Sequence, residues 1–372
     1  MTVSISGTDG VTFNDSSVQT TAAKVGMVNR IINGAMVIDQ RNAGASVSAV
    51  DGAFQLDRFK TVSYDGTSAV TGKFTVQQNA AAVTPPAGFV NYLGVTSSAV
   101  TSLAAGAEYT IGQNIEGFNT ADLNWGTANA ATVTLSFWVR SSLTGTFGGS
   151  LRNTNATRAY PFSFTISTAN TWEYKTITIA GDTSGTWSTT NGIGVRLVFG
   201  LGVGSSGSGT AGAWVGSNIN SVTGATSVVG TNGATFYITG VQLEKGSTAT
   251  SFDYRPYGTE LQLCQRYAYP IRGGFSGFGN GTTVVDTGFN FPVEMRTAPS
   301  LTQGTLVYIA YGAGSSFVQS ASSTSLPNNI TQNGCILRFN NFTLTANSAY
   351  VLAPNATTTA VTTYAGILTA EL

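Results

Sequence analysis

The amino-acid sequence predicts an all-β fold in two domains, and three observations carry this prediction. Only 9% of the 372 residues are charged, whereas 45 are glycine, which is typical of short strands joined by tight turns. The apolar fraction of 42% is high enough for packed cores. Several stretches alternate apolar and polar residues, as strands do. We therefore expect an N-terminal arm, a jelly-roll β-sandwich, a short linking helix and a C-terminal small β-sandwich.

Residues 1–44 are predicted to form the arm and a connector. Val3 and Ile5 alternate with polar neighbours, and a second short apolar run follows at residues 11–13. This segment is too small and too polar to hold a core of its own. It is either a loose arm or an attachment segment that folds against neighbouring chains. Residues 25–44 are expected to hold a short helix or an extended connector, and we interpret them as a hinge.

Residues 45–257 are predicted to form the jelly roll. Its clearest strand is 132–140, in which every second residue is apolar, while Trp138 and Arg140 lie on the polar face. Residues 204–233 are rich in Gly, Ser, Ala and Thr and are predicted to be a mobile loop. About eight strands with Gly- and Asn-rich turns fit a sandwich of two sheets. The other strand candidates are residues 58–64, 73–78, 109–115, 160–166, 172–179 and 195–203.

The last strand of the jelly roll leads into the linking helix. Phe236 and Ile238 fall on one face, whereas Val241 has the opposite parity, so Gly240 between them marks a β-bulge. Further along, the run ELQLCQRY consists mainly of good helix formers and lacks β-branched residues. We place the linking helix at residues 258–267.

Residues 268–372 are predicted to form the C-terminal sandwich. Residues 273–281 form a glycine-rich stretch with two phenylalanines, which we interpret as a loop. This stretch lacks the strand–loop–helix frame and the lysine of a phosphate-binding loop, so no nucleotide site is expected. The strand candidates are residues 283–286, 306–311, 335–339, 350–352 and 364–368.

Several stretches resemble proteins of bacteriophage tail fibres and related virion appendages. They are ITGVQLEKGSTATSFDYRPYGTELQLCQRY (238–267), NGAMVIDQRN (33–42), FPVEMRTAP (291–299) and the ending AEL (370–372). In that group, the first stretch joins a jelly roll similar to carbohydrate-binding modules to a C-terminal β-sandwich. The run FNDSSVQTT (13–21) resembles a common opening of fibre proteins. The resemblance therefore implies that the arm attaches to other virion proteins.

Composition excludes several classes of chemistry. The chain has no histidine, which excludes Ser-His-Asp and Cys-His catalysis, and its two cysteines, Cys264 and Cys335, are too few for a zinc cluster. Both cysteines are predicted to be buried free thiols. The formal net charge is zero and no basic stripe occurs, so no nucleic-acid partner is expected. There is no signal-peptide pattern and no apolar run of membrane-spanning length, so we expect synthesis in a host cytoplasm and no membrane insertion.

Carboxylates leave two further possibilities. Glycoside hydrolysis needs two acids about 5 to 9.5 Å apart across a cleft. Nothing in the sequence distinguishes the nearest pairs from solvated turn residues; these pairs are Glu108 with Glu116 and Glu173 with Asp182. Aspartates in jelly-roll loops can hold calcium, but a structural role is favoured for Asp51, Asp57, Asp65 and Asp253. We therefore expect no catalytic residues, no metal and no cofactor.

Sugar binding without catalysis needs flat aromatic side chains that face solvent, with polar groups beside them. Trp138 fits because it lies on the polar face of its strand, beside Arg140. Trp214 lies in the predicted mobile loop, and Tyr237 has the parity opposite to Phe236. For each aromatic residue the alternative is packing in a core. The candidate glycan-binding residues are Trp138, Arg140, Trp214 and Tyr237.

The function expected from these observations is that of a non-enzymatic virion protein. The resemblance implies a homotrimeric fibre or spike that acts outside the cell on the phage particle and binds host cell-surface polysaccharide. Three weak sugar sites on one rigid assembly bind far more tightly than one. Two other functions stay open. One is a purely structural head fibre, decoration or collar protein. The other is a polysaccharide depolymerase, which is disfavoured because no β-helix repeat is visible.

Overall fold

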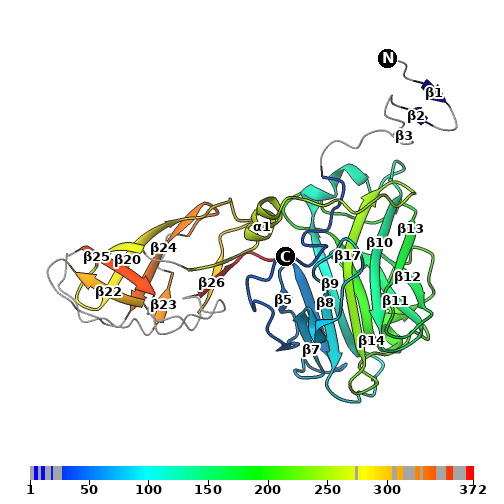
Figure 1. Cartoon of the computed structure of the whole chain (residues 1–372), viewed down its shortest axis with the longest axis horizontal. Coiled ribbons are helices and arrows are strands. Elements are labelled where there is room, and N and C mark those ends of the chain that lie inside the picture. Colours follow the sequence, from blue (N-terminus) through cyan, green and yellow to red (C-terminus); the bar gives the residue numbers. More distant parts are fainter. Residues whose placement is uncertain are drawn as a thin grey trace.

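The computed structural model describes residues 27–272, 275–303, 308–312, 323–326, 330–340, 349–354 and 366–372, together with three short strands near the N-terminus. These strands, β1 (Ser4–Ser6), β2 (Gly10–Thr12) and β3 (Val18–Gln19), form one antiparallel sheet. Two larger β units follow, with helix α1 (Tyr257–Gln265) between them (Figure 1). The predicted all-β fold class is confirmed.

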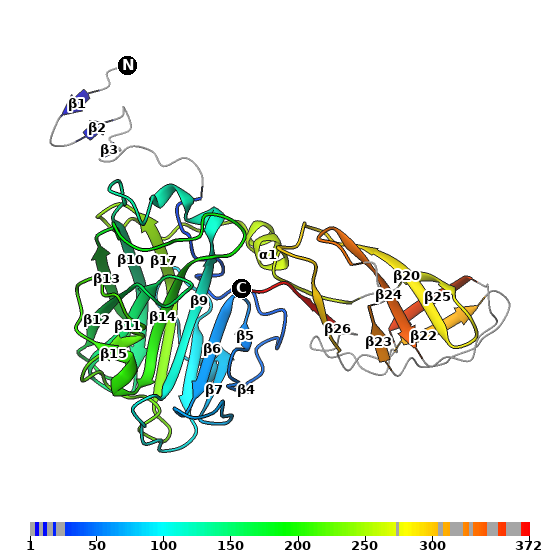
Figure 2. The same ribbon diagram turned by 180° about the vertical axis from the view of Figure 1, so that it is seen from behind.

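Two six-stranded antiparallel sheets form the jelly roll. The first sheet contains, in order, β13 (Glu173–Ile179), β10 (Val133–Ser141), β17 (Thr235–Lys245), β8 (Leu93–Ser97), β7 (Phe74–Gln78) and β4 (Val47–Ser48). The second sheet contains β12 (Ala159–Ile166), β11 (Gly145–Arg152), β14 (Ile193–Val203), β9 (Glu108–Glu116), β6 (Phe59–Tyr64) and β5 (Phe54–Leu56). Figure 2 shows β14, β9 and β6 of this second sheet side by side.

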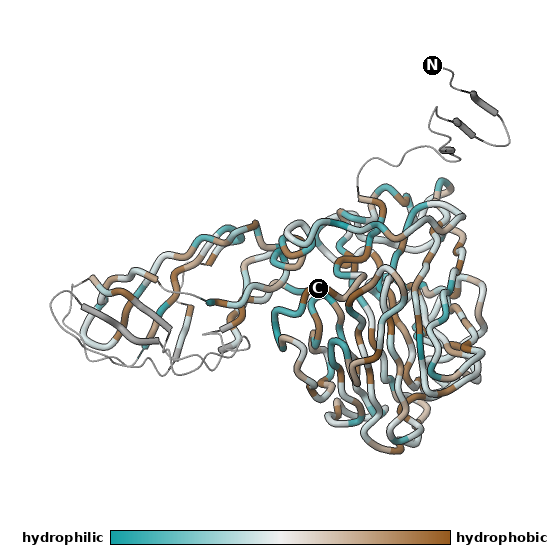
Figure 3. The backbone as a smooth tube through the Cα atoms, in the orientation of Figure 1, coloured by the Kyte–Doolittle hydropathy of each residue, from teal (hydrophilic) through white to brown (hydrophobic). Residues whose placement is uncertain are grey.

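The space between the two sheets is filled by the alternating apolar residues. The apolar face of β10 is fully buried, as its alternation predicted, and Phe137 packs edge-to-face on Phe164 and Phe199 of the second sheet at 5.0 Å. Apolar residues recur along the strands of both β units (Figure 3). Burial of about 25 cal/mol per Å² of apolar surface is the main force that holds such a sandwich together.

Residues 204–233 do not form a mobile loop, so this prediction was wrong. They contain η4 (Ser205–Gly207) and the parallel pair β15 (Ser208–Gly209) and β16 (Ser221–Val222). Val228 and Val229 are fully buried in the jelly-roll core. A Cβ on Gly204 would lie 2.1 Å from the Ala104 carbonyl oxygen. The small residues of this stretch therefore allow close packing, which composition alone does not distinguish from mobility.

The C-terminal unit has its own core and its own sheets. Ile271, Val285, Leu337 and Phe339 are buried in this core, as is the free thiol of Cys335. A three-stranded sheet contains β18 (Ala268–Pro270), β26 (Gly366–Thr369) and β21 (Ser300–Gln303). A six-stranded sheet contains β22 (Tyr308–Gly312), β25 (Ala349–Pro354), β19 (Phe275–Gly279), β20 (Val284–Asn290), β24 (Gly334–Asn340) and β23 (Ser323–Ser325).

Strand β19 corrects the prediction of a glycine-rich loop at residues 273–281. Phe278 pairs with Asp286 of β20, and Phe275 pairs with Leu352 of β25. A Cβ on Gly277 would lie 2.6 Å from the Val285 side chain. The glycine in this strand therefore makes room for a neighbouring side chain.

The junction between the two β units is made of residues 27–44, helix α1 and residues 370–372. Residues 27–44 contain no helix, and they are not a hinge. Ile31 is buried in the jelly-roll core, while Ile32 and Ile38 pack against Tyr267 and the free, buried thiol of Cys264 at the end of α1. A segment with side chains in two cores cannot bend freely.

Buried ion pairs complete the junction. Glu371 forms salt bridges with Arg41, at 2.6 Å, and with Arg58, whose guanidinium also lies 3.5 Å from the centre of the Tyr267 ring. Glu116 accepts two hydrogen bonds from Arg266 and one from the hydroxyl of Tyr267. Because buried charges are costly unless they are paired, these contacts hold the two units in one arrangement.

Candidate functional site

An aromatic cavity lies on the outer face of the first jelly-roll sheet. Its volume is about 340 Å³. The sheet residues that line it come from β10, β17 and β13, and the alternation of β10 turns Ser136 and Trp138 away from the core. The remaining lining residues come from two loops that fold over this face. The lining set is Ala87, Gly88, Phe89, Ser136, Trp138, Tyr174, Gly240, Thr250, Ser251, Phe252 and Tyr254.

The β-bulge at Gly240 shapes the cavity. The register between β10 and β17 shifts between Ser136 and Trp138, which confirms the bulge predicted from the change of parity. Gly240 has a φ of 61°, in the left-handed region that favours glycine. A Cβ at this position would lie 2.6 Å from the ring of Phe89 and 3.2 Å from that of Trp138. The missing side chain therefore leaves room for the rings of Phe89 and Trp138 beside Gly240.

The loop after β17 is held against the sheet by two buried polar side chains of that strand. The carboxylate of Glu244 accepts hydrogen bonds from the backbone N–H of Thr250 at 2.7 Å and from its hydroxyl at 2.8 Å. The side-chain oxygen of Gln242 accepts one from the backbone N–H of Asp253 at 2.8 Å. These contacts position the aromatic residues on either side of Asp253.

The aromatic rings form two groups around the cavity. Phe89, Phe252 and Tyr254 pack on one another with ring centres 4.8 to 5.4 Å apart, and the Tyr254 hydroxyl donates to the Gly88 carbonyl. Trp138 lies 5.3 Å from Tyr174, which is 45% exposed. Mutual packing fixes the first group, and both groups present ring surface to solvent, since Tyr254 is 54% exposed.

The cavity is uncharged. No Asp, Glu, Lys or Arg is among the residues that line it, and its polar side chains are the hydroxyls of Ser136, Thr250, Ser251 and the tyrosines. Burial raises the pKa of Tyr254 above its ordinary value, so this hydroxyl remains a neutral donor. The arrangement has the groups needed to bind a neutral, polar ligand with an apolar face, and it contains no acid–base pair.

Of the four candidate residues, the structure places Trp138 in this cavity. Tyr237 is only 2% exposed, so the prediction that it faces a ligand was wrong. It is covered by Ala80, in η1 (Ala80–Ala82), and by Tyr92 and Trp172 on the same outer face. Arg140 lies 5.5 Å above the Tyr237 ring and donates from Nε to the carbonyl of Asn170 at 3.0 Å, outside the cavity lining.

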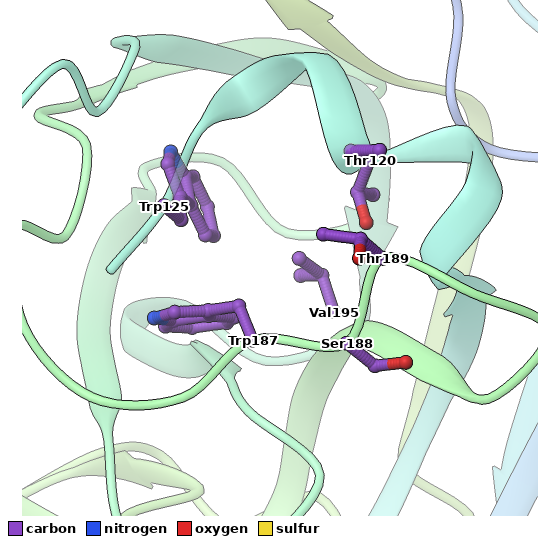
Figure 4. A pocket seen from close by; sticks show the side chains of 7 residues that line it. Thr120, Trp125, Trp187, Ser188, Thr189 and Val195 are labelled. Carbon is purple, nitrogen blue, oxygen red and sulfur yellow. The ribbon is translucent and has the colours of Figure 1, made fainter. Parts of the chain in front are cut away.

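Trp214 belongs to a separate aromatic cluster. It packs edge-to-face on Trp125, Tyr160 and Trp187 at 5.3 to 5.4 Å, and its Nε1 donates to the carbonyl of Ala180. Figure 4 shows Trp125 and Trp187 beside a cavity of about 10 Å³, which is room for one water molecule at most. This packing contradicts the prediction that Trp214 is a mobile loop-tip contact.

Four aromatic residues of the cavity were missed in the sequence, namely Phe89, Tyr174, Phe252 and Tyr254. Tyr174 shares the outward parity of its strand, so alternation was a usable signal. The other three lie in irregular loops before β8 and after β17, where no periodicity marks a direction. Only the three-dimensional structure brings them together.

The acid pairs considered for hydrolysis are not arranged for it. Glu108 and Glu116 stand at opposite ends of β9, roughly 26 Å apart at the usual rise per residue, which exceeds the separation that glycosidases use. Glu173 forms a salt bridge with Lys175 and Asp182 with Arg158.

Among the described residues, no cluster of three His, Cys, Asp or Glu side chains is placed to hold a metal, and no helix is long and apolar enough to cross a membrane.

Comparisons with known proteins find likeness at the level of structure alone. No protein-family model and no curated protein matches the sequence. Similar solved structures include a family 4 carbohydrate-binding module (14% identity, 57% of this chain and 98% of that one, TM-score 0.28). A family 11 module from Clostridium thermocellum in complex with a β-1,3-1,4-mixed-linked tetrasaccharide has 12% identity over 54% of this chain and 98% of that one (TM-score 0.26). A tandem of two family 22 modules from Paenibacillus barcinonensis has 10% identity over 89% and 99% (TM-score 0.26). Identities and TM-scores this low carry no argument from those proteins to this chain.

Proposed function

We propose that this chain is a non-catalytic glycan-binding protein and that the aromatic cavity is its sugar-binding site. The observation that carries the proposal is an uncharged cavity of about 340 Å³ in which exposed aromatic rings stand beside hydroxyl groups. Protein sites for small ligands are typically of this size, mostly apolar, with a few polar groups that fix orientation. A sugar ring has an apolar C–H face that stacks on Trp138 and Tyr174, and hydroxyls that Ser136, Thr250 and Ser251 can bind.

We further propose that the protein acts on a phage particle as a homotrimeric fibre or spike. This proposal is supported by the four stretches that resemble virion appendage proteins and by the run FNDSSVQTT (13–21), which resembles a common opening of fibre proteins. In this proposal the arm attaches to other virion proteins and the jelly roll binds polysaccharide of the host cell surface. Trimerisation would multiply a weak single-site affinity through effective concentration. Light scattering of the full chain measures its molar mass and so tests the proposed trimer. The second candidate function is a purely structural role in the virion.

The test of sugar binding uses Tyr174→Ala and Trp138→Ala in the full chain. Both variants are titrated against an array of bacterial surface polysaccharides on which the unmodified protein has been profiled. Each substitution is expected to weaken binding tenfold or more, equivalent to about 1.4 kcal/mol. Because Tyr174 is 45% exposed, its removal should leave the thermal unfolding temperature nearly unchanged.

The matched control is Tyr257→Ala on helix α1. Tyr257 is 63% exposed and does not line the cavity, so its removal should leave binding unchanged. Equal losses of polysaccharide binding in Tyr174→Ala and Tyr257→Ala would show that the aromatic cavity is not the sugar-binding site. A folded trimer that binds none of the polysaccharides would favour the structural virion role.

A further inference from the structure

A pair of arginines lies directly opposite each other on the outer face of the second jelly-roll sheet. Arg152 of β11 pairs in register with Arg196 of β14, and Arg196 pairs with Asn114 of β9. Residues opposite each other on neighbouring strands share a face and nearly touch, so like charges at such positions destabilise a sheet. Lys60 of β6 adds a third positive charge on the same face. The arrangement therefore favours a compensating anion. Glu108 supplies part of that charge, because it interacts electrostatically with both arginines.

The described part of the chain does not supply that anion through an ion pair. Most of the described arginines form a salt bridge with a carboxylate, as the half-buried Arg41 and the buried Arg58 do with Glu371. Neither Arg152 nor Arg196 forms one with a described residue. The buried Nε of each has no hydrogen-bond partner there, as is also true of Arg41 and Arg58, so the missing salt bridge is what sets this pair apart. Arg152 is only 8% exposed, and its Nη1 donates to the side-chain oxygen of Asn218.

These groups line a small cavity. Its volume is about 30 Å³, room for about two water-sized groups. Glu108 is the one acid among its lining residues. Glu108 forms no salt bridge with either arginine in the part of the chain that the structure describes. The cavity therefore combines three cations, one acid and room for two oxygen atoms.

We propose that this cavity, formed by Arg152, Arg196 and Lys60, binds the carboxylate of an acidic sugar residue such as a uronic acid. The planar guanidinium groups match a carboxylate with parallel hydrogen bonds. A space for two oxygens fits that group better than a tetrahedral phosphate or sulfate. The rest of the sugar lies outside, over the face of the sheet. We call this the anion cavity.

The anion cavity is separate from the aromatic cavity. The two lie on different sheets of the sandwich and share no lining residue. The proposal therefore goes beyond the sugar site described above and does not depend on it.

The test is calorimetric titration of the full chain with a trimer of galacturonic acid. The methyl ester of the same trimer, which keeps the sugar rings and removes the charge, is the ligand control. We expect the free acid to bind at least tenfold more tightly than the ester, and its affinity to fall as salt is raised. Arg196→Gln is expected to remove this preference. Inorganic phosphate and sulfate, added as competitors, are expected to displace the free acid weakly.

The protein controls separate this proposal from a general charge effect and from the aromatic cavity. Lys245→Gln removes one exposed positive charge from the first sheet and should leave the preference intact. Trp138→Ala should also leave it intact. Arg152→Gln repeats the test at the buried partner. If Arg152→Gln does not fold, Arg196→Lys replaces it; this variant keeps the positive charge and should retain part of the preference for the free acid. Equal binding of acid and ester, or a preference that survives Arg196→Gln, would overturn the proposal. Stronger binding of phosphate or sulfate than of the free acid would also overturn the assignment of a carboxylate.

Discussion

Asp57 is a buried carboxylic acid whose titration is linked to folding. Its two oxygens accept hydrogen bonds from the backbone and side-chain nitrogens of Gln40 at 2.6 and 2.7 Å. Burial raises its pKa from 3.8 to about 6, although the nearby Arg41 acts in the opposite direction. Between these two pH values, the folded chain holds a proton that the unfolded chain has lost. The contribution of Asp57 to stability is therefore greatest below about pH 4 and falls as the pH rises through 6.

We expect Asp57→Asn to remove this pH dependence. As the pH rises from 4 to 7, the free energy of unfolding of the unmodified protein should fall relative to that of the variant by on the order of 3 kcal/mol. Urea unfolding of both proteins at several pH values measures the difference. Comparison with the variant cancels the titration of other carboxyl groups. If the unmodified protein instead keeps a constant stability relative to the variant, or becomes more stable relative to it as the pH rises, Asp57 is ionised in the folded chain throughout this range.

At the scale of elements, the bulge in β17 links stability to the shape of the aromatic cavity. Gly240→Ala places a side chain on a backbone with a φ of 61° and forces Phe89 to move. We expect a loss of about 1–3 kcal/mol in stability and sugar binding weakened at least as much as by Trp138→Ala. The two readouts are chemical unfolding and titration with the best-binding polysaccharide.

Gly233→Ala is the matched control for the bulge. Gly233 also has a positive φ, of 75°, but nothing lies within 4 Å of the added Cβ. This variant should carry the backbone cost alone and keep full sugar binding. If both variants bind normally, the shape of the bulge does not set the cavity.

Alternation predicted those strands whose two faces differ in polarity. The strands β10, β9 and β14 were expected within about two residues of their ends, and the bulge was located by one change of parity. Strand β11 was missed because GTFGGSLR is rich in glycine. A Cβ on its Gly149 would lie 2.3 Å from the Val198 carbonyl oxygen, so the close approach of the neighbouring strand requires glycine at this position. The cavity walls were missed for a related reason, since loop residues far apart in the sequence have no periodic signal.

At the scale of the whole molecule, the stretches that resemble virion proteins converge on the junction. Residues 33–42 contact both Glu260 and Glu371, and Arg296 contacts both Arg266 and residues 370–371. Arg296 donates to the carbonyls of Ala370 and Glu371 at 2.7 Å, and Gln40 donates to the carbonyl of Ala268. What these stretches share is thus the means of fixing one β unit against the other.

Glu371→Gln tests whether the junction couples the two units. The substitution leaves the cations of Arg41 and Arg58 buried without their carboxylate, which we expect to cost about 3–5 kcal/mol. Scanning calorimetry should show the two units unfolding in separate transitions or at a lower common temperature. Glu294→Gln, at an exposed residue of the same unit, should leave the profile unchanged. An unaltered profile for Glu371→Gln would mean that apolar contacts alone hold the junction.

The order in which the ribosome makes the chain gives this junction a further consequence. Arg41 and Arg58 are synthesised early, together with the jelly roll, but their shared partner Glu371 follows the entire C-terminal unit. Until that unit is complete, the nascent jelly roll carries two cations at a site built to be buried. Translation products that stop inside the C-terminal unit would therefore lack the counter-charge, and proteases would degrade them in preference to finished chains.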